Sequence, residues 1–140
     1  MTRFAAAREL LAPPEDVWEF IAEPHHLADW WPGIAAVEPD RRGLAPGARW
    51  QVRAPSRPTL LRRPDSSGLL LVLRVEPPQL VAWQLTRDRI DVELRLEERA
   101  PDRTEAALVI SGPWLIGLSR ALPRRALARL HALCQTAAEL

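Results

Sequence analysis

The stretch "LAPPEDVWEFIAEPHHLADWWPGI", Leu11 to Ile34, decides the fold of this 140-residue chain. Its segment "PPEDVWEFIA" predicts a short helix, because proline suits a first turn and the acids after it favour the positive helix end. Pro24 interrupts that helix, and "HHLADWW" predicts a second short helical piece that ends at "PG". The preceding "RFAAARELLA" predicts a first strand.

After this stretch the hydrophobic period changes from helical to two, which is typical of strands. The alternating runs are "GARWQVRAP", "LLLVLRVEPP", "LVAWQLT", "RIDVELRLEER" and "TEAALVIS". Clean alternation predicts an antiparallel sheet with one wet face and one buried face. In the second run, the pattern places these residues on the buried face: Leu69, Leu71, Leu73 and Val75.

The segment from Trp114 to Leu140 repeats apolar residues at spacings of three and four, which predicts a helix about 40 Å long. We expect Pro123 to kink or divide it. The predicted fold class is α+β, with one domain over residues 1–140. A curved antiparallel sheet of about seven strands wraps around the long C-terminal helix, and two short helices follow the first strand. This architecture favours an internal apolar cavity.

Composition narrows the function. The formal net charge of +1 argues against a nucleic-acid binder. The sequence contains no run of ~18 apolar residues, so we expect no stable membrane insertion. The chain has no lysine and no tyrosine, which excludes Schiff-base chemistry and phenolic acid catalysis. The single cysteine, Cys134, excludes an internal disulfide and predicts a buried thiol in a cytoplasmic protein. No phosphate-binding glycine loop or other cofactor motif is present.

Arginines gather in a stretch without acids between residues 41 and 64. The stretch is either a solvated loop and strand face or a rim that attracts anions. Its arginines are Arg41, Arg42, Arg49, Arg53, Arg57, Arg62 and Arg63.

The opening stretch resembles the START-like, SRPBCC or helix-grip superfamily, and most of all its polyketide cyclase/dehydrase-type members. Such proteins show an Ala-Pro pair, a Val-Trp pair, an acidic-Pro step, a Leu and a Trp, and then Pro-Gly. The matching residues are Ala12, Pro13, Val17, Trp18, Glu23, Pro24, Leu27, Trp30, Trp31, Pro32 and Gly33. The resemblance covers the whole chain in element order. It implies the helix-grip fold with a cavity for a hydrophobic ligand, but it carries no universal catalytic motif.

Strand parity and this resemblance predict the cavity wall. Trp30 is interpreted as core, whereas Trp31 is either a partly exposed cap or a wall of the cavity entrance. The predicted lining residues are Trp31, Trp50, Val52, Leu71, Leu73, Trp83, Leu85, Leu94, Leu108, Ile110, Leu118 and Leu122. The sequence leaves open whether the cavity is empty or filled by side chains.

Charged and titratable groups near this cavity are few. His25 and His26 are adjacent and so point about 100° apart on a helix, which predicts no metal site there. They are either a solvated or capping pair or an acid/base at the cavity mouth. Arg8 either enters the apolar interior or reaches solvent. These three residues are the weak catalytic candidates.

We expect the chain to bind or transport a small hydrophobic ligand, lipid-, isoprenoid- or polyketide-like, without a cofactor. One alternative is an aromatic polyketide cyclase or dehydratase in the same cavity, which ranks lower because few polar groups point inward. A second alternative is a co-chaperone-like or toxin-like protein-interaction module, which a filled cavity would favour. Homodimerisation stays open.

Overall fold

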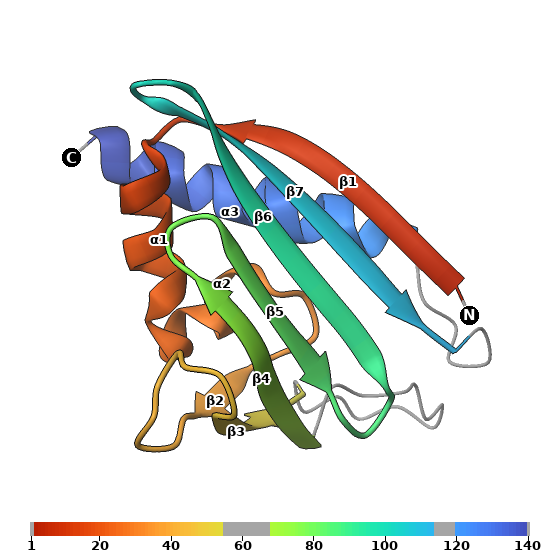
Figure 1. Ribbon diagram of the computed structural model, residues 1–140. Helices are drawn as coiled ribbons and strands as arrows, with labels where there is room; N and C mark the ends of the chain where they lie inside the picture. Colours follow the sequence, from red (N-terminus) through yellow and green to blue (C-terminus); the bar gives the residue numbers. More distant parts are fainter. Residues whose placement is uncertain (1, 55–67, 114–119, 140) are drawn as a thin grey trace.

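The computed structural model describes residues 2–54, 68–113 and 120–139. Within these residues, seven strands form one antiparallel sheet in the order β1-β7-β6-β5-β4-β3-β2 (Figure 1). The strands are β1 (Thr2–Leu10), β2 (Ala36–Glu38), β3 (Arg49–Arg53), β4 (Gly68–Glu76), β5 (Leu80–Leu85), β6 (Ile90–Ala100) and β7 (Arg103–Gly112). The helices are α1 (Pro14–Ala22), the 3-10 turn η1 (Pro24–His26), α2 (Leu27–Trp30) and α3 (Ala121–Glu139). This arrangement confirms the predicted fold class.

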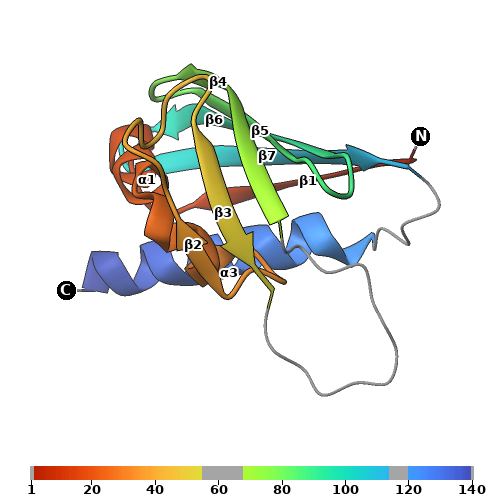
Figure 2. The ribbon, with the colours of Figure 1, turned by 90° about the horizontal axis from the view of Figure 1, so that it is seen from below.

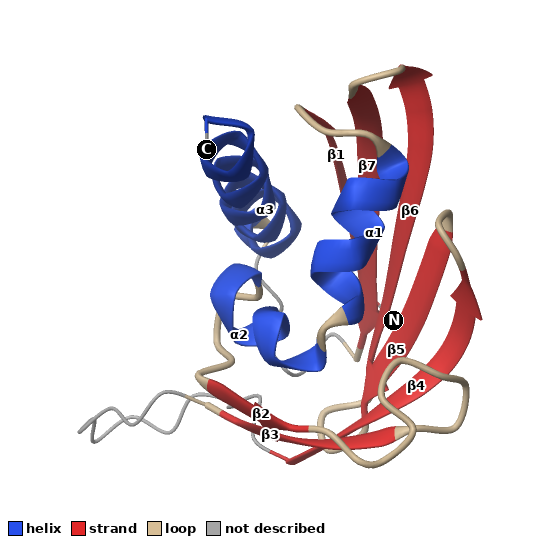
Figure 3. Ribbon diagram, turned by 90° about the vertical axis from the view of Figure 1, so that its left-hand side faces the viewer, coloured by secondary structure: helices blue, strands red, loops and turns tan. Residues whose placement is uncertain are grey.

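All the helices lie on one side of the sheet, which curves so that β2 and β3 run beneath α2 (Figure 3). Helix α3 packs against β1 and β7 and also contacts α2 (Figure 2). No helix in the described ranges is long and apolar enough to cross a membrane. The buried face of the sheet and the helices therefore share one hydrophobic core.

Helix α1 forms as its sequence predicts. Pro14 occupies the first helical position, and Glu15 and Asp16 follow in the first turn. Proline has the right φ there, and the two carboxylates complement the positive helix end. The buried residues Val17 and Ile21, four apart, face the sheet core.

The predicted C-terminal helix lies within the described residues only from residue 120 onward. Helix α3 starts at Ala121, so Pro123 lies in its first turn and the helix continues unbroken to Glu139. Backbone N–H groups in the first turn of a helix have no intrahelical acceptor, so a proline there removes no hydrogen bond from the helix. The expected kink is therefore wrong within residues 121–139, and the alternative, a division of the segment, stays a prediction. The 19 residues of α3 span about 28 Å. Residues 114–119 lie outside the described residues.

The predicted buried face of β4 is wrong over its first half. Leu70 and Val72 are buried, whereas Leu73 is 44% exposed and Leu71 is only half-buried. The register against β5 shifts between residues 72 and 74, which marks a β-bulge. A bulge inserts one residue and inverts the inward parity along a strand. Val75 lies beyond the bulge and pairs with a buried residue of β5, as the alternation there predicts.

Strand β2 was not assigned from the sequence, because three residues are too few to show alternation. The loop 39–48 joins it to β3, and the Asp40 carboxylate holds this loop. One carboxylate oxygen accepts the backbone N–H of Arg42 at 3.0 Å, and the other accepts that of Arg49 at 2.9 Å. Hydrogen bonding, first of all from the Arg49 N–H, lowers the pKa of Asp40.

The outer face of the sheet carries arginine–carboxylate pairs. Arg99 of β6 lies 2.9 Å from Glu105 of β7, and Arg95 lies 2.8 Å from Glu93 within β6. Exposed pairs of this kind contribute little to folding, about 0–1 kcal/mol each. They leave the wet face charged, and the stability of the sheet must come from its buried face.

Replacing Leu70 and Leu73 separately tests the bulge. Leu70→Ala should lower the free energy of unfolding by about 2–5 kcal/mol, because it opens a hole in the core. Leu73→Ala, three residues away and on the outer face, should change it by only about 0.5 kcal/mol. Urea unfolding of both variants measures the difference. If Leu73→Ala proves the more damaging, the assigned parity is wrong.

The pH dependence of Asp40→Asn tests the loop. The pKa of Asp40 is lowered below its ordinary value of 3.8 on folding, so its stabilisation is complete above that value. This stabilisation is lost as the pH falls through the pKa of Asp40 in the folded protein. The wild-type protein should therefore exceed the variant in urea midpoint at pH 6, and the gap should shrink on acidification to pH 3. A gap that stays constant would contradict this account.

Candidate functional site

A small cavity lies between the sheet and the short helices α1 and α2, which we call the helical corner. Its volume is about 10 Å³, which is room for about one water molecule. Residues from α1, α2, the loop 39–48, β3, β4 and β5 form its wall. They are Ile21, Leu27, Trp30, Leu44, Trp50, Leu70, Val72, Val81 and Trp83. Every one of these side chains is apolar or aromatic, and in this part of the described interior side chains fill most of the space.

Three tryptophans fill the space beside this cavity. The ring centroids of Trp30 and Trp83 lie 5.9 Å apart, and those of Trp31 and Trp83 lie 5.6 Å apart. All the contacts are T-shaped, an arrangement that aromatic pairs prefer. Trp31 is 1% exposed, so it is neither an exposed cap nor an entrance wall. The predicted core position of Trp30 is correct.

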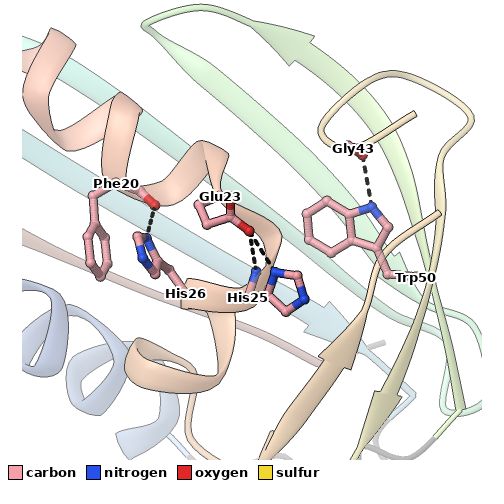
Figure 4. A network of polar contacts seen from close by, with 6 residues as sticks. All are labelled: Phe20, Glu23, His25, His26, Gly43 and Trp50. Carbon is pink, nitrogen blue, oxygen red and sulfur yellow. Dashed lines mark hydrogen bonds and ion pairs between the residues drawn. The ribbon is translucent and has the colours of Figure 1, made fainter. Parts of the chain in front are cut away.

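The indole N–H groups of Trp50 and Trp83, two tryptophans of the cavity wall, differ in their hydrogen bonding. The indole N–H of Trp50 donates to the carbonyl oxygen of Gly43 at 2.9 Å (Figure 4). The indole N–H of Trp83 is buried and has no partner among the described residues. Leu44 is the only wall residue that is half-buried rather than buried, so the wall comes nearest to solvent there.

Of the predicted lining residues, the cavity wall contains Trp50 and Trp83. Leu73 is exposed and Leu71 half-buried, so their predicted inward positions are wrong for the reason given above. Leu122 is partly buried, and Leu118 lies outside the described residues. The others are buried in the core but do not line the cavity: Trp31, Val52, Leu85, Leu94, Leu108 and Ile110.

Sequence reasoning missed several wall residues. Val81 shares the face of Trp83, so its alternation could have found it. Leu70 and Val72 were hidden by the bulge, which no residue in the uniformly apolar run announces. Leu44 belongs to a loop, where no periodicity exists to place a side chain.

The two histidines sit at the end of α1 and do not line the cavity. Nδ1 of His25 lies 2.7 Å from a carboxylate oxygen of Glu23, and that hydrogen bond is the main reason why the pKa of Glu23 is lowered. Nδ1 of His26 lies 2.7 Å from the carbonyl oxygen of Phe20 and donates a hydrogen bond to it (Figure 4). The imidazole ring of His26 also stacks on the Phe20 ring, with 4.2 Å between the two ring centroids. Phe20 has one of the last carbonyls of α1, so His26 caps the helix.

The remaining candidates are also outside the cavity. Arg8 is exposed although it shares the strand parity of the buried Leu10. In the described part of the chain, no three His, Cys, Asp or Glu side chains gather as metal ligands. Cys134 is buried as predicted, and burial is the main cause of its raised pKa, followed by Asp16. A raised pKa keeps the thiol protonated and unreactive.

Surface features are more polar. Arg41, Arg49 and Arg53 are exposed, whereas Arg57, Arg62 and Arg63 lie outside the described residues. Two open hollows occur on the surface, one along β2, β3 and β4 and one between the start of α1 and the β4–β5 turn. Both include charged side chains, unlike the apolar cavity.

Comparisons with known proteins place this fold. No curated protein matches the sequence. Among solved structures, the protein XoxI from Bacillus cereus has a TM-score of 0.73 at 12% identity, over 99% of each chain. Protein MLL2253 from Mesorhizobium loti has a TM-score of 0.68 at 21% identity, over 96% of this chain and 98% of its own. CalU16 from Micromonospora echinospora has a TM-score of 0.66 at 19% identity, over 98% of this chain and 78% of its own.

These likenesses show the fold alone. The family model described as "Polyketide cyclase / dehydrase and lipid transport" matches residues 1–133, which is nearly the whole chain. This match confirms the resemblance that the Leu11–Ile34 stretch suggested. The chain belongs to the polyketide cyclase/dehydrase and lipid transport family, of the SRPBCC type.

Proposed function

We propose that this protein binds a small hydrophobic molecule, of a lipid, isoprenoid or polyketide class, between the sheet and the helical corner. The observation that carries the proposal is the cavity wall, in which every side chain is apolar or aromatic. The family to which the chain belongs supports the same reading. Burial of apolar ligand surface would supply the affinity, at about 25 cal/mol per Å².

A ligand larger than water requires the cavity to widen. Leu44 is the natural point for this, because it is half-buried and belongs to the loop 39–48 rather than to a strand. Movement of Leu44 and the Trp50 ring would join the cavity to solvent without breaking the sheet. Ligands therefore bind by displacing side chains rather than by entering empty space.

Carriage suits this site better than catalysis. An enzyme needs acid, base or charge-stabilising groups within reach of the ligand. Arg8, His25 and His26 do not line the cavity. The cyclase or dehydratase alternative is left without a proton donor or acceptor in the wall beyond the indole N–H groups. Cytoplasmic location and homodimerisation stay predictions from the sequence.

A protein-interaction module is the second candidate, and the small size of the cavity favours it. The exposed arginines Arg124, Arg125 and Arg129 on α3 have no ion-pair or hydrogen-bond partner among the described residues. They would offer an acidic partner protein a charged surface.

Native mass spectrometry of the purified protein, followed by solvent extraction, separates the two candidates. A co-purifying apolar molecule, or one-to-one binding of added N-phenyl-1-naphthylamine, supports the ligand-binding function. An empty protein that takes up no apolar probe overturns it and favours the interaction module.

Two phenylalanine substitutions on neighbouring residues of β5 locate the site. Val81→Phe places a ring in the cavity wall and should weaken N-phenyl-1-naphthylamine binding at least about tenfold. Ala82→Phe adds the same ring to the opposite face of the strand and should leave the affinity unchanged. Fluorescence titration gives both affinities, and urea unfolding confirms that both variants are folded. Equal affinities for the two variants would place the ligand elsewhere.

A further inference from the structure

One fully buried hydrogen-bond donor of a wall residue has no acceptor among the described residues. Trp83 is 4% exposed, lines the cavity, and holds a buried indole N–H without a partner. Within the part of the chain that the structure describes, no other buried side-chain nitrogen or oxygen lacks one. Buried donors in native proteins are almost always satisfied, so an unsatisfied one calls for an explanation.

The neighbouring Trp50 shows how this cavity satisfies an indole when it can. Its N–H donates to the Gly43 carbonyl oxygen at 2.9 Å, through the loop 39–48. Among the described residues, no loop carbonyl accepts the Trp83 N–H in the same way. Its ring neighbours are the T-shaped Trp30 and Trp31, and an N–H facing an aromatic ring is a weak substitute for an oxygen acceptor.

A water molecule is a poor partner for this donor. The cavity has room for about one water, but a buried water is held by about 2–4 polar groups. Among the described residues of the wall, the only polar side-chain groups are the indole N–H groups of Trp30, Trp50 and Trp83. That of Trp50 already donates to Gly43, and none of the three can accept a hydrogen bond from a water molecule. An acceptor carried on an apolar body would satisfy the N–H without leaving its own polar atoms unpaired.

We propose that the Trp83 N–H is the polar anchor of the site. The inference rests on the proposed function and names the ligand class: an uncharged, largely apolar molecule with one hydrogen-bond acceptor, such as a ketone, quinone or ether oxygen. None of the described residues that line the cavity is charged, so an ionised ligand would be buried without a counter-charge from them. A pure hydrocarbon would leave the Trp83 N–H unsatisfied.

Two probes of the same size and shape test this class. 2-Acetylnaphthalene has a carbonyl oxygen where 2-isopropylnaphthalene has a methyl group. Calorimetric titration of the wild-type protein should show the ketone binding about five- to tenfold more tightly than the hydrocarbon. In ¹H–¹⁵N spectra, only the ketone should move the Trp83 indole resonance downfield. The spectrum of Trp83→Phe identifies that resonance.

An isosteric replacement isolates the N–H from the rest of the ring. Benzothienylalanine has a sulfur atom in place of the indole N–H and nearly the same shape. At position 83 it should abolish the preference for the ketone. At position 50 it should keep the preference, because the Trp50 N–H is already bound to Gly43.

The outcomes separate the two proposals. Equal binding of both probes by the wild-type protein overturns the polar anchor and leaves the hydrophobic-ligand function standing. A preference that survives the replacement at position 83 also overturns the anchor. If neither probe binds, the proposed function fails and the anchor fails with it.

Discussion

The contact between Trp83 and the two tryptophans of the helical corner joins the two halves of this fold. Trp83 belongs to the middle of the sheet, and Trp30 and Trp31 end the short helices. A curved antiparallel sheet has one dry face, which must be covered. Helix α3 covers the side of β1 and β7. The three indoles cover the other side, where no long helix lies.

This way of closing the core also sets the size of the cavity. The large indole rings fill most of the space between this part of the sheet and the short helices. The cavity left between the rings and the loop 39–48 has a volume of only about 10 Å³. Aromatic rings have few rotatable bonds, so they rearrange as whole blocks rather than by small adjustments. A ligand that enters must therefore move at least one wall residue. The least buried of these residues, Leu44, belongs to a loop rather than to the sheet.

The sequence predicted the architecture better than the site. Alternation over β6 is clean for eight residues, and proline with two acids marks the start of α1, so both elements were correctly placed. The first half of β4 was assigned to the wrong face, because an apolar run does not reveal where a bulge inverts its parity. Trp50 and Trp83 could be placed by parity alone. Leu44 could not, since loop side chains follow no period. The capping role of His26 depends on a carbonyl six residues earlier, which only the folded chain brings near.

The pairs on the outer face of the sheet have a consequence for handling the protein. Arg99, Arg95 and their glutamate partners carry charges that no alkaline solution removes, because guanidinium groups stay protonated. The chain has neither lysine nor tyrosine, so few of its side chains change charge between neutral and alkaline pH, and its formal charge at pH 7 is only +1. The sequence has an isoelectric point of about 8.1, not far above neutrality. Proteins with little net charge tend to associate. Buffers at a pH well away from 8.1 are therefore the ones that keep its molecules apart.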